Sequence, residues 1–221
     1  MKHHQIFDDW EKVWFQLVRR GAVGPFYRYR QRPTFFIEGP VLCFEELNTV
    51  ERNLGFSIPA PLREFFLEYS QEIDISWQFP SESPVSFPNW GYCQLGLSQT
   101  LYLYGVYQNW LATCFNDLDN EYDLVWQNKF PIQEVGNGDL IALELNETDF
   151  GSILYLSHDD SYRNGWMMGT DLVSFLEIWG KLGFPGPEYW ENEQFMNSSN
   201  MCLDLSSPNA KTWLEWLGES S

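Results

Sequence analysis

The segment at residues 131–145, P-I-Q-E-V-G-N-G-D-L-I-A-L-E-L, constrains the fold more than any other part of the sequence. Apolar residues stand on both sides of Asn137-Gly138. This dipeptide is the strongest short-range hairpin signal, because a two-residue type I′ turn requires positive φ at both central positions. A dinucleotide-binding fingerprint would need a third glycine where Ile141 stands in a β-rich run. We therefore predict a β-hairpin with a structural turn formed by Gly136, Asn137, Gly138 and Asp139.

Composition indicates a folded globular chain with an acidic surface. Of the 221 residues, 44% are hydrophobic and 18% are aromatic, which is far too apolar for intrinsic disorder. The chain has 13 Lys plus Arg against 31 Asp plus Glu, a formal net charge of -18. Phosphate backbones and anionic membranes repel such a surface, so we predict no direct binding to nucleic acid or membrane. The charge either only maintains solubility, which composition alone favours, or attracts a basic partner protein.

Cysteine usage and hydropathy predict a soluble cytoplasmic protein. The N-terminus has no apolar signal core, and no apolar stretch approaches membrane-spanning length. The cysteines are far apart and have no Cys-x-x-Cys pairing, so we expect buried free thiols in a reducing cytosol. These residues are Cys43, Cys93, Cys114 and Cys202.

Helical spacing of apolar residues recurs in the first third of the chain. Residues 6–20 predict an amphipathic helix, and residues 45–69 predict a bent pair of helices, with Gly55 ending the first and Pro59 and Pro61 fixing the bend. Between them, residues 22–44 contain the runs T-F-F-I and V-L-C-F, which suit a hairpin or a pair of edge strands.

The remaining chain predicts mostly strands, followed by helices. Residues 76–93 contain prolines among serines and aromatics, which favours an irregular loop, and residues 94–126 have strand-like runs of Leu, Tyr, Val and Trp. A strand is expected at 152–157, and a helix from Asp171 with Gly183 as its stop. The Trp-rich tail then carries two short predicted helices with exposed aromatic residues.

The order of these segments resembles the SUKH superfamily, which includes yeast cell-wall-synthesis regulators of the Smi/Knr type and many bacterial members. The resemblance rests on E-R-N-L-G-F-S-I-P-A-P-L-R-E-F at 51–65, on the hairpin segment at 131–145 and on I-L-Y-L-S-H-D at 153–159. It implies a bacterial-type member with an α+β fold, in which a mostly antiparallel sheet packs against helices. It also implies no known catalytic centre and no cofactor.

The segments that match the superfamily, and those that do not, divide the chain into three predicted regions. Residues 1–44 would form an N-terminal helix and short strands, residues 45–183 the SUKH-like core, and residues 184–221 a Trp-rich C-terminal extension packed on that core. The long N-terminal helix and the tail depart from the minimal pattern of the superfamily.

Two polar segments could carry chemistry or could be structural. Asp139 is either an acid beside a bound ligand or a side chain that accepts backbone N–H bonds and locks the turn, and local rules favour the second interpretation. Residues 157–160, Ser-His-Asp-Asp, could supply metal ligands or a base, but a solvated turn at the end of a strand explains them better. We therefore predict no metal site.

Two further motifs fall short of their templates. Residues 96–100, G-L-S-Q-T, lack the second glycine of a serine nucleophile elbow, and His158 is the only well-placed imidazole base. Residues 116–123, N-D-L-D-N-E-Y-D, have the oxygen-rich character of a calcium loop without its glycine and terminal glutamate. We therefore predict a protein that is not an enzyme.

The resemblance also implies a function, because many bacterial members of the superfamily are immunity proteins that bind and neutralise toxins. The leading functional hypothesis is therefore an immunity protein, and a basic nuclease toxin would suit the net charge of -18. One alternative is a regulatory scaffold. A less favoured alternative is a hydrolase that uses Asp139, His158 and Asp159. The predicted partner contacts combine acids with tyrosines as aromatic anchors. They are Asp117, Asp119, Glu121, Tyr122, Asp123, Asp159, Asp160 and Tyr162.

Overall fold

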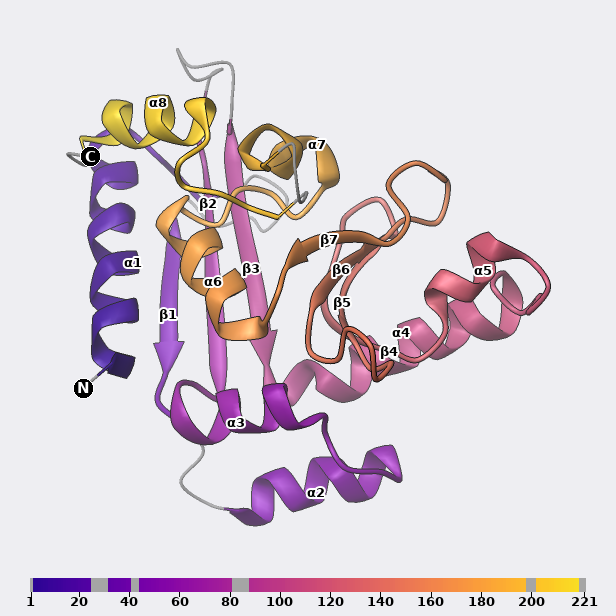
Figure 1. Ribbon diagram of the computed structural model, residues 1–221. Coiled ribbons are helices and arrows are strands. Elements are labelled where there is room, and N and C mark those ends of the chain that lie inside the picture. The colour runs from indigo at the N-terminus through magenta and orange to yellow at the C-terminus, as the bar shows by residue number, and fades with distance from the viewer. Residues whose placement is uncertain (1, 25–31, 41–43, 81–87, 198–201, 219–221) are drawn as a thin grey trace.

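The computed structural model describes residues 2–24, 32–40, 44–80, 88–197 and 202–218 (Figure 1). Two antiparallel sheets form its centre, which confirms the α+β class but divides the expected sheet in two. The first sheet has the order β1-β2-β3, with β1 (Thr34–Glu38), β2 (Glu72–Gln78) and β3 (Trp90–Gly96). The second has the order β4-β5-β6-β7, with β4 (Lys129–Glu134), β5 (Leu140–Glu144), β6 (Ile153–Leu156) and β7 (Trp166–Gly169).

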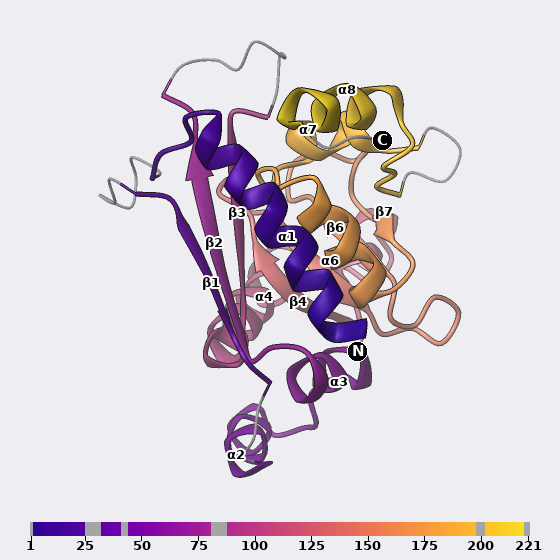
Figure 2. The same ribbon diagram turned by 90° about the vertical axis from the view of Figure 1, so that its left-hand side faces the viewer.

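Helices surround these sheets on several sides. They are α1 (Lys2–Arg19), α2 (Phe44–Leu54), α3 (Ala60–Glu68), α4 (Thr100–Thr113), α5 (Glu121–Trp126), α6 (Leu172–Lys181), α7 (Tyr189–Asn192) and α8 (Pro208–Leu217), with the 3₁₀ turns η2 (Leu97–Gln99) and η3 (Glu193–Phe195). In Figure 2, α1 lies in front of α6 beside the first sheet. Within the described ranges, no helix combines the length and the apolar character needed to cross a membrane.

All three predicted regions contribute to one large hydrophobic cluster. Trp10 of α1 makes an edge contact with Phe184, with ring centroids 4.8 Å apart. Trp77 of β2 stacks on Trp213 of α8 at 6.3 Å. The N-terminal helix and the C-terminal tail therefore complete the main core. The sequence predicted exposed aromatic residues in the tail, but among those described only Trp190 is exposed. Phe184, Phe195 and Trp213 are buried, and Tyr189 and Trp216 are half-buried.

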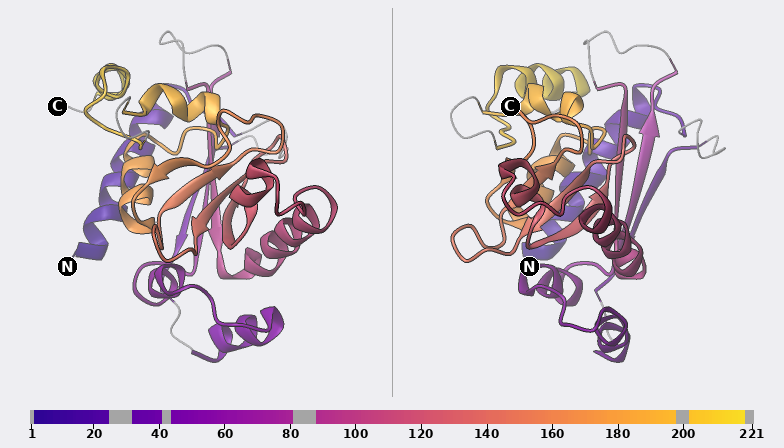
Figure 3. Two further views of the ribbon diagram at one scale, coloured as in Figure 1. Left: turned by 45° about the vertical axis from the view of Figure 1, so that its right-hand side comes forward. Right: turned by 90° about the vertical axis from the view of Figure 1, so that its right-hand side faces the viewer.

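The second sheet is covered on both faces, and this explains the continuous apolar runs of its strands. Ile141 and Tyr155 face the main cluster, whereas Leu140 and Leu156 belong to a smaller cluster beneath α4 and α5. Figure 3 shows α4 and α6 on opposite sides of this sheet. A strand buried on both faces has no need of polar alternation.

Helix α6 confirms the prediction made from its end signals. The Asp171 carboxylate accepts a hydrogen bond from the Ser174 backbone N–H at 2.8 Å, and Gly183 follows the helix with φ +83°. Gly55 similarly follows α2 with φ +81°, and α3 begins at Ala60 after the bend at Pro59. The predicted strand at 152–157 appears as β6.

Three predictions made from the sequence are wrong in part. Residues 94–126 form α4 and α5 after the end of β3, instead of the predicted strands. The predicted loop at 76–93 contains the end of β2 and the start of β3. In the second apolar run at 41–44, residues 41–43 lie outside the described residues, and Phe44 begins α2.

The cysteine prediction also needs a correction. Cys93, Cys114 and Cys202 are free thiols, as expected, but Cys114 is exposed and Cys202 is half-buried. Only Cys93 of these three is buried, and burial raises the pKa of its thiol. Cys43 lies outside the described residues.

The predicted hairpin is confirmed, but its turn type differs from the two-residue type I′ turn. The Gly138 N–H donates to the Val135 carbonyl at 2.9 Å, and the Val135 N–H donates to the Asp139 carbonyl at 3.0 Å. Gly138 has φ +100°, whereas Asn137 is not among the described residues with positive φ. This pattern is a three-residue loop with glycine in the left-handed position.

Replacing Gly138 with valine is expected to destabilise the protein by about 1 to 3 kcal/mol, because a β-branched residue resists positive φ. A Cβ atom at this position would also lie 3.4 Å from the Trp110 ring. Chemical denaturation of the wild type and the variant measures the effect. An unchanged midpoint would show that this position carries no strain in the variant.

Candidate protein-binding surface

Asp139 connects the β4–β5 turn to the end of β6. Its side chain is fully buried. One carboxylate oxygen, Oδ1, accepts the His158 backbone N–H at 2.8 Å and lies 2.6 Å from His158 Nδ1. The other, Oδ2, accepts from the Tyr155 hydroxyl at 2.6 Å and from Asn137 Nδ2 at 2.7 Å. The favoured structural interpretation of Asp139 therefore agrees with the geometry, with contacts that extend beyond the turn.

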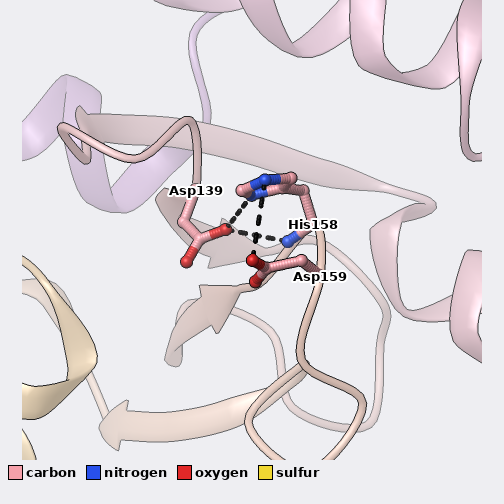
Figure 4. A group of neighbouring side chains, drawn as sticks. All are labelled: Asp139, His158 and Asp159. Carbon is pink, nitrogen blue, oxygen red and sulfur yellow. Dashed lines mark hydrogen bonds and ion pairs between the residues drawn. The ribbon is translucent and has the colours of Figure 1, made fainter.

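The His158 ring is held between Asp139 and Trp110. It stacks on the Trp110 ring with centroids 5.4 Å apart, and its Nδ1 lies within hydrogen-bond distance of Asp139 Oδ1. The other ring nitrogen, Nε2, lies 4.0 Å from Asp159 Oδ2. Figure 4 shows how these three side chains converge at the strand end. This geometry fixes the direction in which the chain leaves β6.

The same three residues are the candidate metal ligands of the described chain. One ligand atom from each of Asp139, His158 and Asp159 lies within 4.8 Å of the others. Both oxygens of Asp139 already accept two contacts each, so His158 Nε2 and Asp159 are the groups left for a cation. Zinc sites generally use three or four protein ligands. The cluster suits the positioning of a loop better than the binding of a metal ion.

The structure brings the two predicted acidic segments together. The Tyr122 hydroxyl donates to the Ser157 carbonyl at 2.6 Å, and Trp126 Nε1 donates to the same oxygen at 3.2 Å. Asn164 Nδ2 returns a bond to the Tyr122 carbonyl at 3.0 Å. Helix α5 is thereby fixed against the loop that follows β6. Burial raises the pKa of Tyr122 to about 12, so its hydroxyl remains a donor at neutral pH.

The predicted contact acids differ in their accessibility. Asp117, Asp119, Glu121 and Asp159 are exposed. Asp160 is half-buried, and its carboxylate pairs with Arg163 at 2.5 Å, a hydrogen bond that lowers the pKa of Asp160.

Asp123 is the exception among these acids. Its side chain is buried, and its carboxylate accepts the backbone N–H of Asp117 at 3.0 Å. It shapes the start of α5 and is not available to a partner. Another oxygen-bearing side chain of the segment 116–123 also has a structural role. Asn120 caps α5 by accepting a hydrogen bond from the Tyr122 N–H.

Exposed apolar side chains lie among the accessible acids. Tyr162, which the sequence suggested as an anchor, is 70% exposed. Leu118 is 63% exposed and Leu124 is 46% exposed, and the sequence analysis missed both. The sequence does contain a signal for an exposed apolar contact, because Leu118 is an isolated apolar residue within a polar run. We name the accessible set the acidic surface, and it consists of Asp117, Leu118, Asp119, Glu121, Leu124, Asp159, Asp160 and Tyr162.

Comparison with known families identifies the chain. The family model described as SMI1 / KNR4 family (SUKH-1) matches residues 44–166, more than half of the sequence. The chain belongs to the SMI1 / KNR4 family (SUKH-1). The SUKH-1 match begins with α2 and reaches the start of β7, so it contains the Asp139 and His158 contacts and the whole acidic surface. It confirms the resemblance inferred from the three motifs. A comparison with curated proteins found no match.

Helix α1 and the segment from Met167 onward lie outside the SUKH-1 match. Arg163, inside the match, contacts this C-terminal segment directly. Its guanidinium lies 4.0 Å from the centroid of the Tyr189 ring and pairs with Glu193 at 3.2 Å. The loop after β6 therefore contacts both α5 and the C-terminal tail.

Proposed function

We propose that this SUKH-1 protein is a non-enzymatic immunity protein that neutralises a toxin by covering a basic surface of the toxin. The observation that supports this proposal most is the convergence of two acidic segments around the Tyr122–Ser157 hydrogen bond. These two segments carry exposed acids together with the exposed apolar side chains of Leu118, Leu124 and Tyr162. Interfaces that bind tightly combine apolar or aromatic anchors with charges arranged around them.

The charge of the chain suits a partner of this kind. A nuclease toxin must present Lys and Arg to phosphates, and a protein with a net charge of -18 is attracted to such a surface over a long range. Attraction of this kind mainly accelerates association and makes it sensitive to salt. Leu118, Leu124 and Tyr162 would then supply the apolar burial that slows dissociation.

A charge-reversal variant tests the proposed surface. Changing Asp119, Glu121 and Asp159 to lysine is expected to weaken binding to the toxin by about a hundredfold, because the steering charges become repulsive. The toxin to use is the product of the gene adjacent to that of this protein, co-expressed in cells whose survival reports protection. A matched variant reverses Glu11, Glu46 and Glu215, which are also exposed.

The outcomes separate the function from its location. If an adjacent toxin is encoded and the wild-type protein neither copurifies with it nor protects cells, the immunity proposal fails. If protection survives reversal of the acidic surface, the function stands and this surface is not the binding site. Equal losses from both charge-reversal variants would indicate that total charge matters more than its position.

The acidic surface would also serve a regulatory scaffold, and the identity of the partner distinguishes the two functions. A partner that is not toxic and is not encoded next to this protein would favour the scaffold. The convergence of Asp139, His158 and Asp159 meets one geometric requirement of the hydrolase hypothesis. If a hydrolytic turnover is detected and Asp139→Asn abolishes it, that hypothesis replaces the proposal.

A further inference from the structure

A groove of about 690 Å³ lies between β3 and the β4–β5 turn. Trp90 and Tyr92 of β3 supply aromatic surface, and Pro187 of the segment before α7 adds apolar surface. Glu134 stands at the end of β4, and none of the lining residues in the described chain is basic. The full lining is Gln78, Trp90, Tyr92, Glu134, Val135, Gly136, Asn137, Gly138 and Pro187.

The Glu134 carboxylate gives the groove a localised negative charge. The Tyr102 hydroxyl donates to its two oxygens at 3.1 and 3.3 Å, and the charge of Glu134 raises the pKa of Tyr102. A smaller cavity of about 200 Å³ is also lined by Glu134 and Tyr92. The carboxylate therefore lies where two cavities meet, and a carboxylate held by one neutral donor retains capacity for further hydrogen bonds.

A second carboxylate lies behind the turn that lines the groove. Glu188 directly follows Pro187 and is only 6% exposed. Its side chain accepts a hydrogen bond from the Gly136 backbone N–H, yet its Oε2 atom has no hydrogen-bond partner. Burial raises the pKa of this carboxyl to about 7, so Glu188 carries only part of a negative charge at neutral pH and Glu134 supplies the main charge of the groove. The groove thus combines aromatic walls with two carboxylates near the same turn.

We propose that this groove binds a basic side chain, an arginine or a lysine, presented by the partner protein. The aliphatic stem of that side chain would pack against Trp90 and Pro187, and its charged end would reach the Glu134 carboxylate. Aromatic faces also attract cations, which favours Trp90 and Tyr92 as walls. This inference rests on the proposed function for its choice of a basic protein as the occupant.

The β4–β5 turn connects the groove to His158, which directly precedes Asp159 of the acidic surface. Gly138 lines the groove, and a Cβ atom at Gly138 would lie 3.8 Å from His158 Cε1. The exposed Asp159 follows His158 directly. A partner that covers the acidic surface could therefore insert one basic side chain across the turn. The groove would then act as the central pocket of the interface, where fully desolvated anchors contribute most.

A short peptide tests the groove without the toxin. The probe is acetyl-Gly-Arg-Gly-amide, and its neutral analogue carries citrulline in place of arginine. Binding is followed by NMR through the indole N–H of Trp90, assigned by comparison with a Trp90→Phe variant. The wild type is expected to bind the arginine peptide about tenfold more tightly than the citrulline peptide, since a hydrogen bond to a charged group is worth that factor or more.

Glu134→Gln provides the sharper comparison. Glutamine retains an acceptor oxygen for Tyr102 but removes the charge, so the preference for arginine is expected to disappear. Glu11→Gln removes the same charge from an exposed position on α1 and is expected to keep the preference. An equal affinity of the wild type for both peptides, or a preference that persists in Glu134→Gln, would overturn the inference.

The failure of this inference differs from failure of the proposed function. If cells are protected from the toxin while the groove shows no preference for arginine, the immunity function stands without the groove. If the groove selects arginine but no adjacent toxin is neutralised, the site stands and its occupant belongs to another basic protein. Tighter binding of a neutral oligosaccharide than of the arginine peptide would also overturn the inference, because aromatic walls with amide groups suit sugars as well.

Discussion

Replacing Asp139 with alanine is expected to lower the free energy of unfolding by on the order of 3 kcal/mol. The carboxylate accepts four contacts, and the variant would leave the buried Tyr155 hydroxyl and the part-buried His158 backbone N–H without their acceptor. Each buried donor left unpaired costs about 1 to 3 kcal/mol, and removal of the desolvated carboxylate offsets part of this cost. Chemical denaturation at neutral pH measures the difference.

Two milder variants test whether these contacts act as a unit. Asp139→Asn retains one acceptor oxygen and is expected to lose about half as much stability. Tyr155→Phe removes the hydroxyl that donates to Asp139 and accepts from the Tyr189 backbone N–H. A double-mutant cycle between positions 139 and 155 should show coupling, because the two side chains are in direct contact at 2.6 Å. An alanine variant within 1 kcal/mol of the wild type would show that the Asp139 contacts contribute little to stability.

Local sequence signals predicted the structure correctly where a residue type has a single well-defined structural role, such as a helix cap. Asp171 before an apolar helical period and Gly183 after it predicted α6 with both of its ends. The Asn-Gly dipeptide predicted the hairpin, but not its turn type, because Gly138 alone takes positive φ and a preceding type I turn satisfies the backbone equally well. Turn type depends on strand register, which a dipeptide does not fix.

Propensity misled the prediction where tertiary packing decides the structure. Residues 100–113, T-L-Y-L-Y-G-V-Y-Q-N-W-L-A-T, are rich in residues that favour strands. Their buried positions, Thr100, Leu103 and Tyr107, nevertheless follow a helical period, and the Tyr107 hydroxyl donates to the Trp126 carbonyl at 2.7 Å. Strand β2, which the prediction missed, does carry a strand pattern in its sequence. Polar and apolar residues alternate in E-I-D-I-S-W-Q, as expected for a strand with one buried face.

The candidate surface was predictable in its composition but not in its assembly. The acids at 117–123 and at 159–160 could be chosen from the sequence, but not the hydrogen bond from Tyr122 to Ser157 that places them side by side. The burial of Asp123 was also invisible, because its role is to accept a backbone N–H six residues earlier in the chain. Contacts between distant segments depend on the packing of α5 against β6.

The buried Glu188 carboxyl makes the folding stability of the protein depend on pH. Burial raises the pKa of its carboxyl to about 7, against an ordinary value of 4.5, and the nearby negative charge of Glu191 adds to this shift. Below pH 4.5 both the folded and the unfolded chain hold the proton, so folding carries no ionisation cost at this residue. As the pH rises through 7, the folded protein must ionise a buried group that the unfolded chain ionises freely. Stability contributed by the protonated carboxyl is therefore lost between about pH 4.5 and pH 7.

Replacing Glu188 with glutamine is expected to remove this loss. Glutamine is isosteric with the protonated carboxyl and can still accept from the Gly136 N–H. The stability of the variant relative to the wild type should rise by about 3 kcal/mol between pH 4.5 and pH 8, the free energy that corresponds to the pKa shift. Denaturant unfolding at several pH values measures it, with Glu11→Gln as a control that removes one exposed charge. A difference between the Glu188 variant and the wild type that stays constant across this range would show that Glu188 is ionised in the folded protein as readily as in the unfolded chain.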